Sequence, residues 1–260
     1  MKISVCGKGG SGKSVVTCLL AKQARSRGYR VLVVDSDESN SGLFKMLGFT
    51  VAPVPLMAIA GGKSRIRGKM TEGGILTENQ IGIGDIPSQY LVEKNGIMLA
   101  CIGKILQAYE GCACPMGVLS REFLKKLQLA DNEIAIVDME AGIEHFGRGI
   151  DEGIDRIILV VEPSAESIAV SRKIREIAAG MSKAAAVVLN KTDSDRVVAV
   201  LEKKIDIKSV DVIGSIPNDP EVFEACLEGR ALEDSEAFAA AGNAMDYLLD
   251  FQADGTHTRQ

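Results

Sequence analysis

The sequence of 260 residues predicts an α/β fold with a doubly wound, mainly parallel sheet and helices on both faces. Two observations predict it. Continuous apolar runs alternate with helix-like stretches, and strands of a parallel sheet that is covered on both faces read as such unbroken runs. The length is also sufficient for one large α/β domain with a full hydrophobic core. We therefore expect residues 1–260 to form a single domain.

The expected strands are short and apolar. They cover residues 3–6, 31–34, 96–101, 133–138, 156–161, 185–190 and 212–214. Helix-like stretches between them include residues 15–20, 164–180 and 194–204, and Gly180 is suited to end the second of these. The segment at about 49–90 is different, because it is rich in Gly, Pro and Lys and has weak periodicity. We expect an irregular insertion with short elements there.

A glycine-rich loop follows the first expected strand. Residues 7–14, GKGGSGKS, match the phosphate-binding pattern G-x-x-x-x-G-K-[ST], and a helix-like stretch follows. In this setting backbone N–H groups and the helix N-terminus hold phosphate oxygens. Lys13 is expected to reach the β- and γ-phosphates, and the Ser14 hydroxyl to bind Mg²⁺. The expected nucleotide-binding residues of this P-loop are Gly7, Gly9, Gly10, Ser11, Gly12, Lys13, Ser14 and Val15.

Carboxylates follow two of the expected strands. Asp35 and Asp37 close the second strand, and Asp138 closes the run 133–138. Ligands of doubly wound folds bind at the carboxyl ends of the strands. We therefore expect Asp138 to bind Mg²⁺ through water and Asp37 to hold the attacking water, with Asp35 in support. The loop 140–144 is expected to sense the γ-phosphate. Each aspartate alone is also typical of a helix N-cap or a turn.

Two of the six cysteines, Cys112 and Cys114, are closely spaced. One C-x-C cannot complete a tetrahedral thiolate site, whereas one pair from each subunit of a symmetric dimer can. Four thiolates suit Zn²⁺, a square-planar arrangement suits Ni²⁺, and a bridged Fe–S cluster is a further option. The alternative is a pair of unligated thiols in a turn. The other cysteines lie in apolar patterns and are expected in the core: Cys6, Cys18, Cys101 and Cys226.

Composition and charge argue against several classes of protein. The net charge of −5 disfavours a protein whose main task is to coat nucleic acid or anionic lipid. No apolar run reaches membrane-spanning length, and strand-like sequence from residue 2 argues against a signal peptide. The cysteine pattern does not suggest a disulfide framework. We therefore expect a cytoplasmic protein with neither nucleic acid nor membrane as its partner.

Lys8 is a second lysine in the phosphate-binding loop, and Gly-Lys-Gly-Gly is the signature of the deviant Walker A proteins. The chain resembles the CooC-type nickel-insertion ATPases, which serve carbon monoxide dehydrogenase, within the MinD/ParA/nitrogenase-iron-protein group (SIMIBI class) of P-loop NTPases. The shared residues span most of the chain and lie at 7–14, 34–37, 112–114, 138–145 and 190–191. Three residues depart from the pattern: Ser14 replaces the usual Thr, Glu38 a common Pro, and Glu140 a common Gly.

The resemblance implies a homodimer that hydrolyses ATP with Mg²⁺ and hands a metal to a client metalloenzyme such as carbon monoxide dehydrogenase. In such a dimer Lys8 touches nucleotide in the facing subunit, as an arginine finger does. Cys112 and Cys114 of both chains would hold Ni²⁺ or Zn²⁺ between them. The implied catalytic residues are Lys8, Lys13, Asp37 and Asp138.

The spacing of the expected base-binding residues does not decide between ATP and GTP. Residues 190–193 read N-K-x-D, which is typical of guanine selection, so Asp193 argues for GTP. The resemblance implies instead that the Asn190 amide reads adenine beside Lys191. Pro217 and Asn218, after the last strand, are expected to contact the base. We expect ATP because Lys8 is the more diagnostic residue.

Two other functions fit the same loop. A positioning ATPase of the MinD/ParA type needs a basic amphipathic C-terminal helix or a basic DNA-binding face, whereas residues 232–251 are acidic. An iron–sulfur-cluster reductase of the nitrogenase-iron-protein type would hold its cluster between two subunits. Metal content and sedimentation with lipid or DNA distinguish the three.

Overall fold

The computed structural model describes residues 1–38, 42–59, 61–62, 75–104, 114–147, 149–205 and 210–255. The strands are β1 Lys2–Gly7, β2 Arg30–Asp35, β3 Ile81–Gly82, β4 Val92–Lys94, β5 Ile97–Cys101, β6 Leu127–Gln128, β7 Glu133–Asp138, β8 Arg156–Val161, β9 Ala184–Thr192 and β10 Asp211–Pro217. The α-helices are α1 Lys13–Ser26, α2 Leu43–Met46, α4 Cys114–Lys126, α5 Glu144–Gly147, α6 Ala165–Gly180, α7 Asp195–Ile205, α8 Pro220–Glu228 and α9 Glu236–Gly255. Short 3₁₀ helices are η1 Leu56–Ala58, η2 Ile83–Asp85, η3 Ser88–Tyr90 and η4 Ile150–Gly153.

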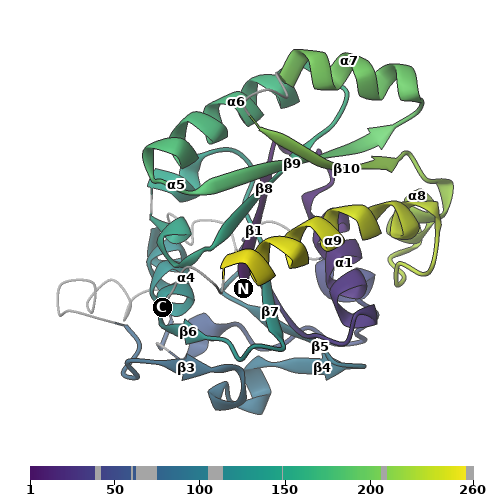
Figure 1. Cartoon of the computed structure of the whole chain (residues 1–260). Coiled ribbons are helices and arrows are strands. Elements are labelled where there is room, and N and C mark those ends of the chain that lie inside the picture. The colour runs from purple at the N-terminus through teal and green to yellow at the C-terminus, as the bar shows by residue number, and fades with distance from the viewer. Residues whose placement is uncertain are drawn as a thin grey trace.

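The main sheet has eight strands in the order β10-β9-β8-β1-β7-β2-β5-β4. All neighbouring pairs in it are parallel except β4 with β5, which is antiparallel. The chain moves from β1 toward β2 on one side and later fills β8 to β10 on the other, so β1 lies at the switch point (Figure 1). The predicted mainly parallel, doubly wound sheet is confirmed, and its ligand edge is the carboxyl end of β1 and its neighbours.

Successive strand residues contribute to opposite faces of the sheet. In β2, Val31 and Val33 join one buried cluster with α1 and α9, whereas Leu32 and Val34 join the other with α4, α6 and α7. This alternation follows from the two-residue period of a strand. Figure 1 shows α1 and α9 side by side on one face, with α6 and α7 running together at the far end of the sheet. Helices therefore cover both faces, as predicted.

The region expected as an insertion contains the short elements η1, β3, η2 and η3. Residue 60 and residues 63–74 lie outside the described part of the chain. The two-residue strand β3 pairs in parallel with β6, immediately after α4. Leu56, Ile83 and Tyr90 are buried in the same cluster as α4 and β2. The described part of the insertion therefore packs on the main sheet.

Three of the four cysteines expected in the core are buried, namely Cys6, Cys18 and Cys101. The expectation for Cys226 is wrong, because this thiol is exposed. In α8 only Ala225 is turned into the core, whereas Phe223 and Leu227 are 67% and 76% exposed. The apolar pattern of this helix therefore does not indicate its buried face.

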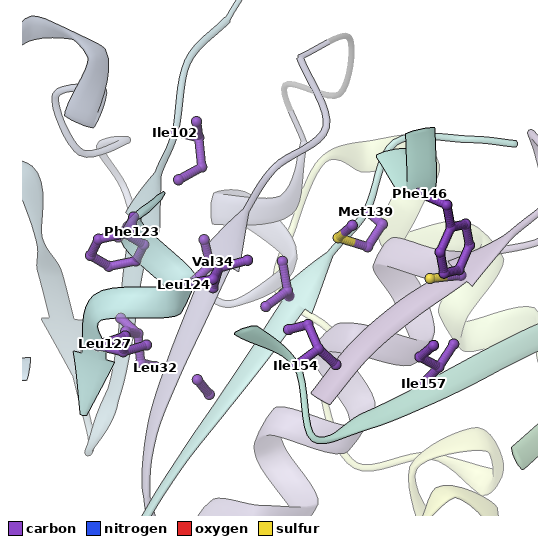
Figure 2. Packing of buried hydrophobic residues seen from close by; sticks show 14 of the residues in the cluster. Leu32, Val34, Ile102, Phe123, Leu124, Leu127, Met139, Phe146, Ile154 and Ile157 are labelled. Atoms are coloured by element: carbon purple, nitrogen blue, oxygen red, sulfur yellow. The ribbon is translucent and has the colours of Figure 1, made fainter. Parts of the chain in front are cut away.

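Helix α4, which begins at Cys114, packs on the sheet through aromatic and aliphatic side chains. Figure 2 shows Phe123 and Leu124 of α4 beside Leu32 and Val34 of β2, all within one buried cluster. Phe123 is 2% exposed and ranks among the largest buried side chains. No helix in the described part of the chain is both long and apolar enough to span a membrane.

We expect Phe123→Ala to lower the free energy of unfolding by ~3–5 kcal/mol, since it removes a buried aromatic ring and leaves a cavity. Urea denaturation followed by circular dichroism measures the change. Phe223→Ala is the matched control: the same substitution on the exposed face of α8 should stay within ~0.5 kcal/mol of wild type. Equal losses in the two variants would contradict the packing described here.

Candidate nucleotide-binding site

The phosphate-binding loop lies at the carboxyl end of the central strand, between β1 and α1. Gly12 immediately precedes α1 and has a φ of 93°, a left-handed conformation that favours glycine. A Cβ atom at Gly12 would lie 2.2 Å from Nδ2 of Asn190, and one at Gly7 would lie 2.6 Å from the Val160 carbonyl oxygen. The two glycines therefore let the loop approach the neighbouring strand ends closely.

Asn190 and Lys191, at the end of β9, hold this loop from the side. The Asn190 amide donates from Nδ2 to the Ser11 carbonyl oxygen at 2.8 Å, and Lys191 donates from Nζ to the Gly10 carbonyl oxygen at 2.6 Å. Both residues therefore lie against the phosphate-binding loop, and their place in a nucleotide site stays a prediction. The sequence did not indicate their bonds to the loop backbone. That Asn190 reads the base stays a prediction.

Pro217 and Asn218 follow the same edge of the sheet at the end of β10. The Asn218 backbone N–H donates to the Thr192 carbonyl oxygen at 3.1 Å, which fixes the two strand ends to each other. Pro217 is half-buried, and Asn218 and Asp193 are exposed. These residues lie beside β9 but their contact with a base, and with it the choice of ATP over GTP, stays a prediction.

Ser14, the expected Mg²⁺ ligand, and Asp138, which is expected to bind Mg²⁺ through water, are in direct contact. The Ser14 hydroxyl donates to Oδ2 of Asp138 at 2.5 Å, and Asp138 is fully buried. A hydroxyl and a carboxylate form the hard oxygen donor set that Mg²⁺ prefers, so the residues present fit this ion. Lys13 is 6% exposed, and its Nζ donates to the Lys8 carbonyl oxygen at 3.4 Å within the loop.

Asp35 lies beside Asp138 because β2 and β7 pair in a register that places the two residues opposite each other. Burial raises the pKa of Asp35 to about 6, although the Lys104 ammonium at 2.8 Å opposes this shift. Burial, and next the charge of Asp35, raises the pKa of Asp138 to about 7. Two carboxylates side by side in a buried place cost free energy when both are ionised, and a cation relieves that cost. The pair is therefore suited to attract Mg²⁺.

Asp37 is half-buried at the same strand end. Its carbonyl oxygen accepts a hydrogen bond from the Lys104 ammonium. Asp37 thus lies at the predicted edge, and the role of its carboxylate in holding the attacking water stays a prediction.

Lys8 is paired within its own chain. Its Nζ lies 2.9 Å from Oε1 of Glu162 and 3.6 Å from Oε2 of Glu166. The same Glu162 carboxylate lies 3.2 Å from Nζ of Lys191. Partial burial alone would raise the pKa of Glu162, but hydrogen bonds from Lys8 and Lys191 outweigh this and lower the pKa below its ordinary value. Lys8 would have to leave Glu162 to reach a nucleotide in a facing subunit.

The loop after Asp138 is bonded to β1 and to the P-loop. The Met139 N–H donates to the Val5 carbonyl oxygen and the Gly142 N–H to the Gly7 carbonyl oxygen, both at 3.2 Å. His145 is fully buried, and its Nε2 lies 3.4 Å from the Cys6 sulfur. The predicted sensing loop is therefore connected directly to the strand that carries the phosphate-binding loop.

The cysteine motif is described only in part. Cys112 lies outside the described residues, and Cys114 is the first residue of α4, with its side chain also outside them. Within the described ranges, no group of three or more His, Cys, Asp or Glu side chains is placed to hold a metal ion. The predicted metal site at Cys112 and Cys114 stays a prediction.

Sequence reasoning missed two charged residues of this site, Lys104 and Glu162. Lys104 follows β5 and Glu162 follows β8 directly, so both belong to the carboxyl edge that already contains Asp35 and Asp138. A search of every strand end for any charged residue, and not only for aspartate, would have found them.

Comparison with known proteins assigns the family. Residues 3–232 match the family model described as the CobQ/CobB/MinD/ParA nucleotide binding domain. An ATP-binding protein of Methanocaldococcus jannaschii, itself uncharacterized, is 47% identical over 237 residues, which is 89% of this chain and 94% of that protein. The carbon monoxide dehydrogenase accessory protein CooC of Rhodospirillum rubrum is 33% identical over 240 residues, 90% of each chain. The septum site-determining protein MinD of Pyrococcus horikoshii, solved with Mg-ADP, covers 95% of both chains with a TM-score of 0.71 and 19% identity, which shows likeness of fold.

The raised pKa of Asp138 predicts how stability changes with pH. A carboxyl group whose pKa rises from 3.8 in the unfolded chain to about 7 in the folded chain binds more protons when folded. Its contribution to stability therefore falls as the pH rises from about 4 to 7. Without nucleotide or Mg²⁺, Asp138→Asn should melt at a higher temperature than wild type at pH 8, and this difference should shrink toward pH 5. For a chain of this size 1 kcal/mol corresponds to ~2–4 °C in Tm.

Differential scanning fluorimetry across this pH range measures the effect. Asp131→Asn, on the exposed turn before β7, is the matched control and should follow wild type at every pH. A stabilisation by Asp138→Asn that does not change with pH would contradict the assignment to a buried carboxylate.

Proposed function

Because the chain belongs to the CobQ/CobB/MinD/ParA nucleotide-binding family, we propose that it is a dimeric, Mg²⁺-dependent ATPase that carries nickel to a client metalloenzyme such as carbon monoxide dehydrogenase. The observation that carries the proposal is the C-x-C motif, Cys112 and Cys114, in a chain 33% identical to a carbon monoxide dehydrogenase accessory protein. In this proposal the nucleotide site hydrolyses ATP, and the cysteine motif binds the nickel cargo.

Hydrolysis of ATP would use groups already gathered at the carboxyl edge of the sheet. The loop backbone and Lys13 bind the phosphates, and Ser14 and Asp138 bind the metal ion. When bound, Mg²⁺ supplies positive charge that neutralises the β- and γ-phosphate oxygens. Asp37 orients the attacking water from the end of β2.

Lys8 provides the reason for a dimer. In the single chain it rests against Glu162, with 23% of its side chain exposed. An ion pair that water reaches contributes little to stability, so its loss is readily offset when a triphosphate offers a denser negative charge. A facing subunit would present that triphosphate, and Lys8 would stabilise the charge that develops during phosphoryl transfer.

The metal site also requires two chains. One C-x-C offers two thiolates, and a tetrahedral or square-planar site needs four ligands. A two-fold axis through the motif would supply all four from identical residues. Nickel is the proposed cargo, and zinc is the ion most suited to compete for the same thiolates.

The alternatives make different requirements of the chain. A positioning ATPase of the MinD/ParA type would pellet with liposomes or DNA in the presence of ATP, although α9 carries Glu236, Asp246 and Asp250 in place of a basic face. An iron–sulfur reductase would show the visible absorption of a cluster after anaerobic purification. Either result would replace the nickel carrier.

We expect the double variant Cys112→Ala/Cys114→Ala to lose the metal that wild type binds at one ion per dimer, because the motif supplies all four thiolates of the proposed site. Metal analysis after size-exclusion chromatography measures the ratio. Cys226→Ala, at an exposed thiol outside the motif, is the control and should keep the metal. Stoichiometric nickel or zinc in the double variant would reject the proposed site.

We expect Lys8→Ala to lower the rate of ATP hydrolysis by about 10³-fold or more, the range for a cation supplied in trans. Nucleotide binding by a single chain should persist, because Lys13 and the loop backbone remain. Lys173→Ala is the matched control: its lysine is exposed and also paired with a glutamate, Glu176, and its rate should equal that of wild type. A steady-state phosphate-release assay over a range of protein concentrations separates the outcomes, and equal rates in the two variants would remove Lys8 from catalysis.

A further inference from the structure

Lys104 contacts both aspartates at the end of β2. Its Nζ lies 2.8 Å from Oδ2 of Asp35, and only 15% and 7% of the two side chains are exposed. The same ammonium group donates a hydrogen bond to the carbonyl oxygen of Asp37. One largely buried cation therefore joins the side chain of the first aspartate to the main chain of the second.

The two residues before Asp37 are already held by the neighbouring strand ends. The Ile102 N–H, directly after β5, donates to the Asp35 carbonyl oxygen at 3.0 Å. The Ser36 N–H donates to the Asp138 carbonyl oxygen, at the end of β7, also at 3.0 Å. The main chain at Asp35 and Ser36 is therefore fixed on both sides by bonds of the sheet type.

Asp37 lies beyond this paired part of the chain. Strand β2 ends at Asp35, which stands opposite Cys101 of β5 and Asp138 of β7. Past this point strand pairing no longer determines the path of the main chain. The bond from Lys104 to the Asp37 carbonyl oxygen therefore adds a constraint that the strand register does not supply.

The place of the Asp37 main chain matters because a group that orients a reacting water must be held accurately. A misplacement of about 1 Å can lower the rate of an enzyme reaction by about 10²-fold, even when its cause lies away from the reacting atoms. A contact that fixes the main chain of such a residue therefore contributes to catalysis without touching the substrate.

We propose that Lys104 is a positioning residue for ATP hydrolysis. It holds the Asp35 carboxylate and the Asp37 carbonyl oxygen together, and it thereby fixes the main chain that carries the Asp37 carboxylate. This inference rests on the function proposed above, because it requires that Asp37 orients the attacking water.

Lys104 is better suited to a fixed contact than to binding phosphate. An ammonium group has three N–H donors, and the contacts with Asp35 and Asp37 engage this group. The withdrawal of the lysine would leave the buried Asp35 carboxylate without its cation, and an unpaired buried charge is costly. Lys104 therefore stays at the strand end when nucleotide binds.

The kinetics of Lys104→Met, which removes the charge and keeps an unbranched side chain, test this role. We expect kcat for ATP hydrolysis to fall by about 10²-fold. The Kd of a non-hydrolysable ATP analogue with Mg²⁺ should stay close to that of wild type. Lys104→Arg should restore much of the rate, because it keeps a cation that can donate to both oxygens. A large loss of nucleotide affinity in Lys104→Met would indicate direct contact with phosphate and overturn the positioning role.

A second aspartate variant tests whether Lys104 acts through Asp37. If it does, Lys104→Met should lower kcat little further in an Asp37→Ala background, since the carboxylate to be positioned is already gone. Two losses that multiply in the double variant would show that Lys104 acts by another route, and the inference would be wrong.

Amide hydrogen exchange tests the contact in the protein without nucleotide. The peptide that contains residues 35–38, followed by mass spectrometry, should exchange faster in Lys104→Met than in wild type, and Lys104→Arg should resemble wild type. Faster exchange is expected because a loosened strand end exposes its N–H groups more often. Unchanged exchange in Lys104→Met would contradict the proposed constraint.

Lys126→Met is the matched control for both measurements. The Lys126 ammonium also joins a carboxylate to a carbonyl oxygen, those of Glu122 and Leu76, each at 2.7 Å. This pair lies on α4 and away from residues 35–37. The variant should keep the wild-type kcat and the wild-type exchange of that peptide, and losses equal to those of Lys104→Met would overturn the inference.

The same variants separate this inference from the function on which it rests. If Asp37→Ala is slow and Lys104→Met is as fast as wild type, the ATPase stands and the inference is wrong. If wild type hydrolyses no ATP, or Asp37→Ala is as fast as wild type, the role proposed for Asp37 fails and the positioning role falls with it. Hydrogen exchange then still shows whether Lys104 fixes the strand end.

Discussion

The contact on which the site depends is the side-by-side placement of Asp35 and Asp138 at the ends of β2 and β7. The register of two central strands fixes it, and burial makes it unfavourable to ionise both carboxylates together. Lys104 supplies positive charge to Asp35, and the Ser14 hydroxyl and the Asp138 carboxylate are oxygen donors of the kind that a divalent ion prefers. The two carboxyl groups are already side by side when no nucleotide is bound, so the electrostatic environment that favours a cation is preorganised.

A second group of charges fixes the phosphate-binding loop from the opposite side. Glu162, at the end of β8, joins Lys8 and Lys191, and Asn190 and Lys191 bond to the loop backbone. The loop therefore contacts Asp138 of the carboxylate pair through Ser14, and it contacts the lysine–glutamate cluster through the Gly10 carbonyl oxygen. Lys8 belongs to that cluster in the single chain, so the role in trans proposed above requires that its ion pair with Glu162 breaks.

The strands, the loop and the acidic strand ends could be predicted because each is a local pattern: an apolar run, a glycine spacing, a carboxylate after a strand. The partners of Lys104 and of Glu162 could not be predicted from the sequence. Lys8 and Glu162, for example, are 154 positions apart, and only the strand order brings them together. The role predicted for Asn190 at the base stays a prediction, and its hydrogen bond to the Ser11 carbonyl oxygen depends on a loop shape that the spacing of residues does not reveal. Cys226 was misplaced because α8 is apolar on more than one side, and a sequence does not say which side another element covers.

The buried thiols have a consequence for the cargo role proposed above. Burial raises the pKa of Cys18 and of Cys101 to about 12, so both keep their protons at neutral pH. Only the deprotonated sulfur is a strong ligand for nickel, zinc or copper. These two cysteines are therefore poor ligands for such ions. Among the cysteines whose side chains the structure describes, only Cys226 is exposed, so solvent exposure decides which of these thiols a metal ion can reach.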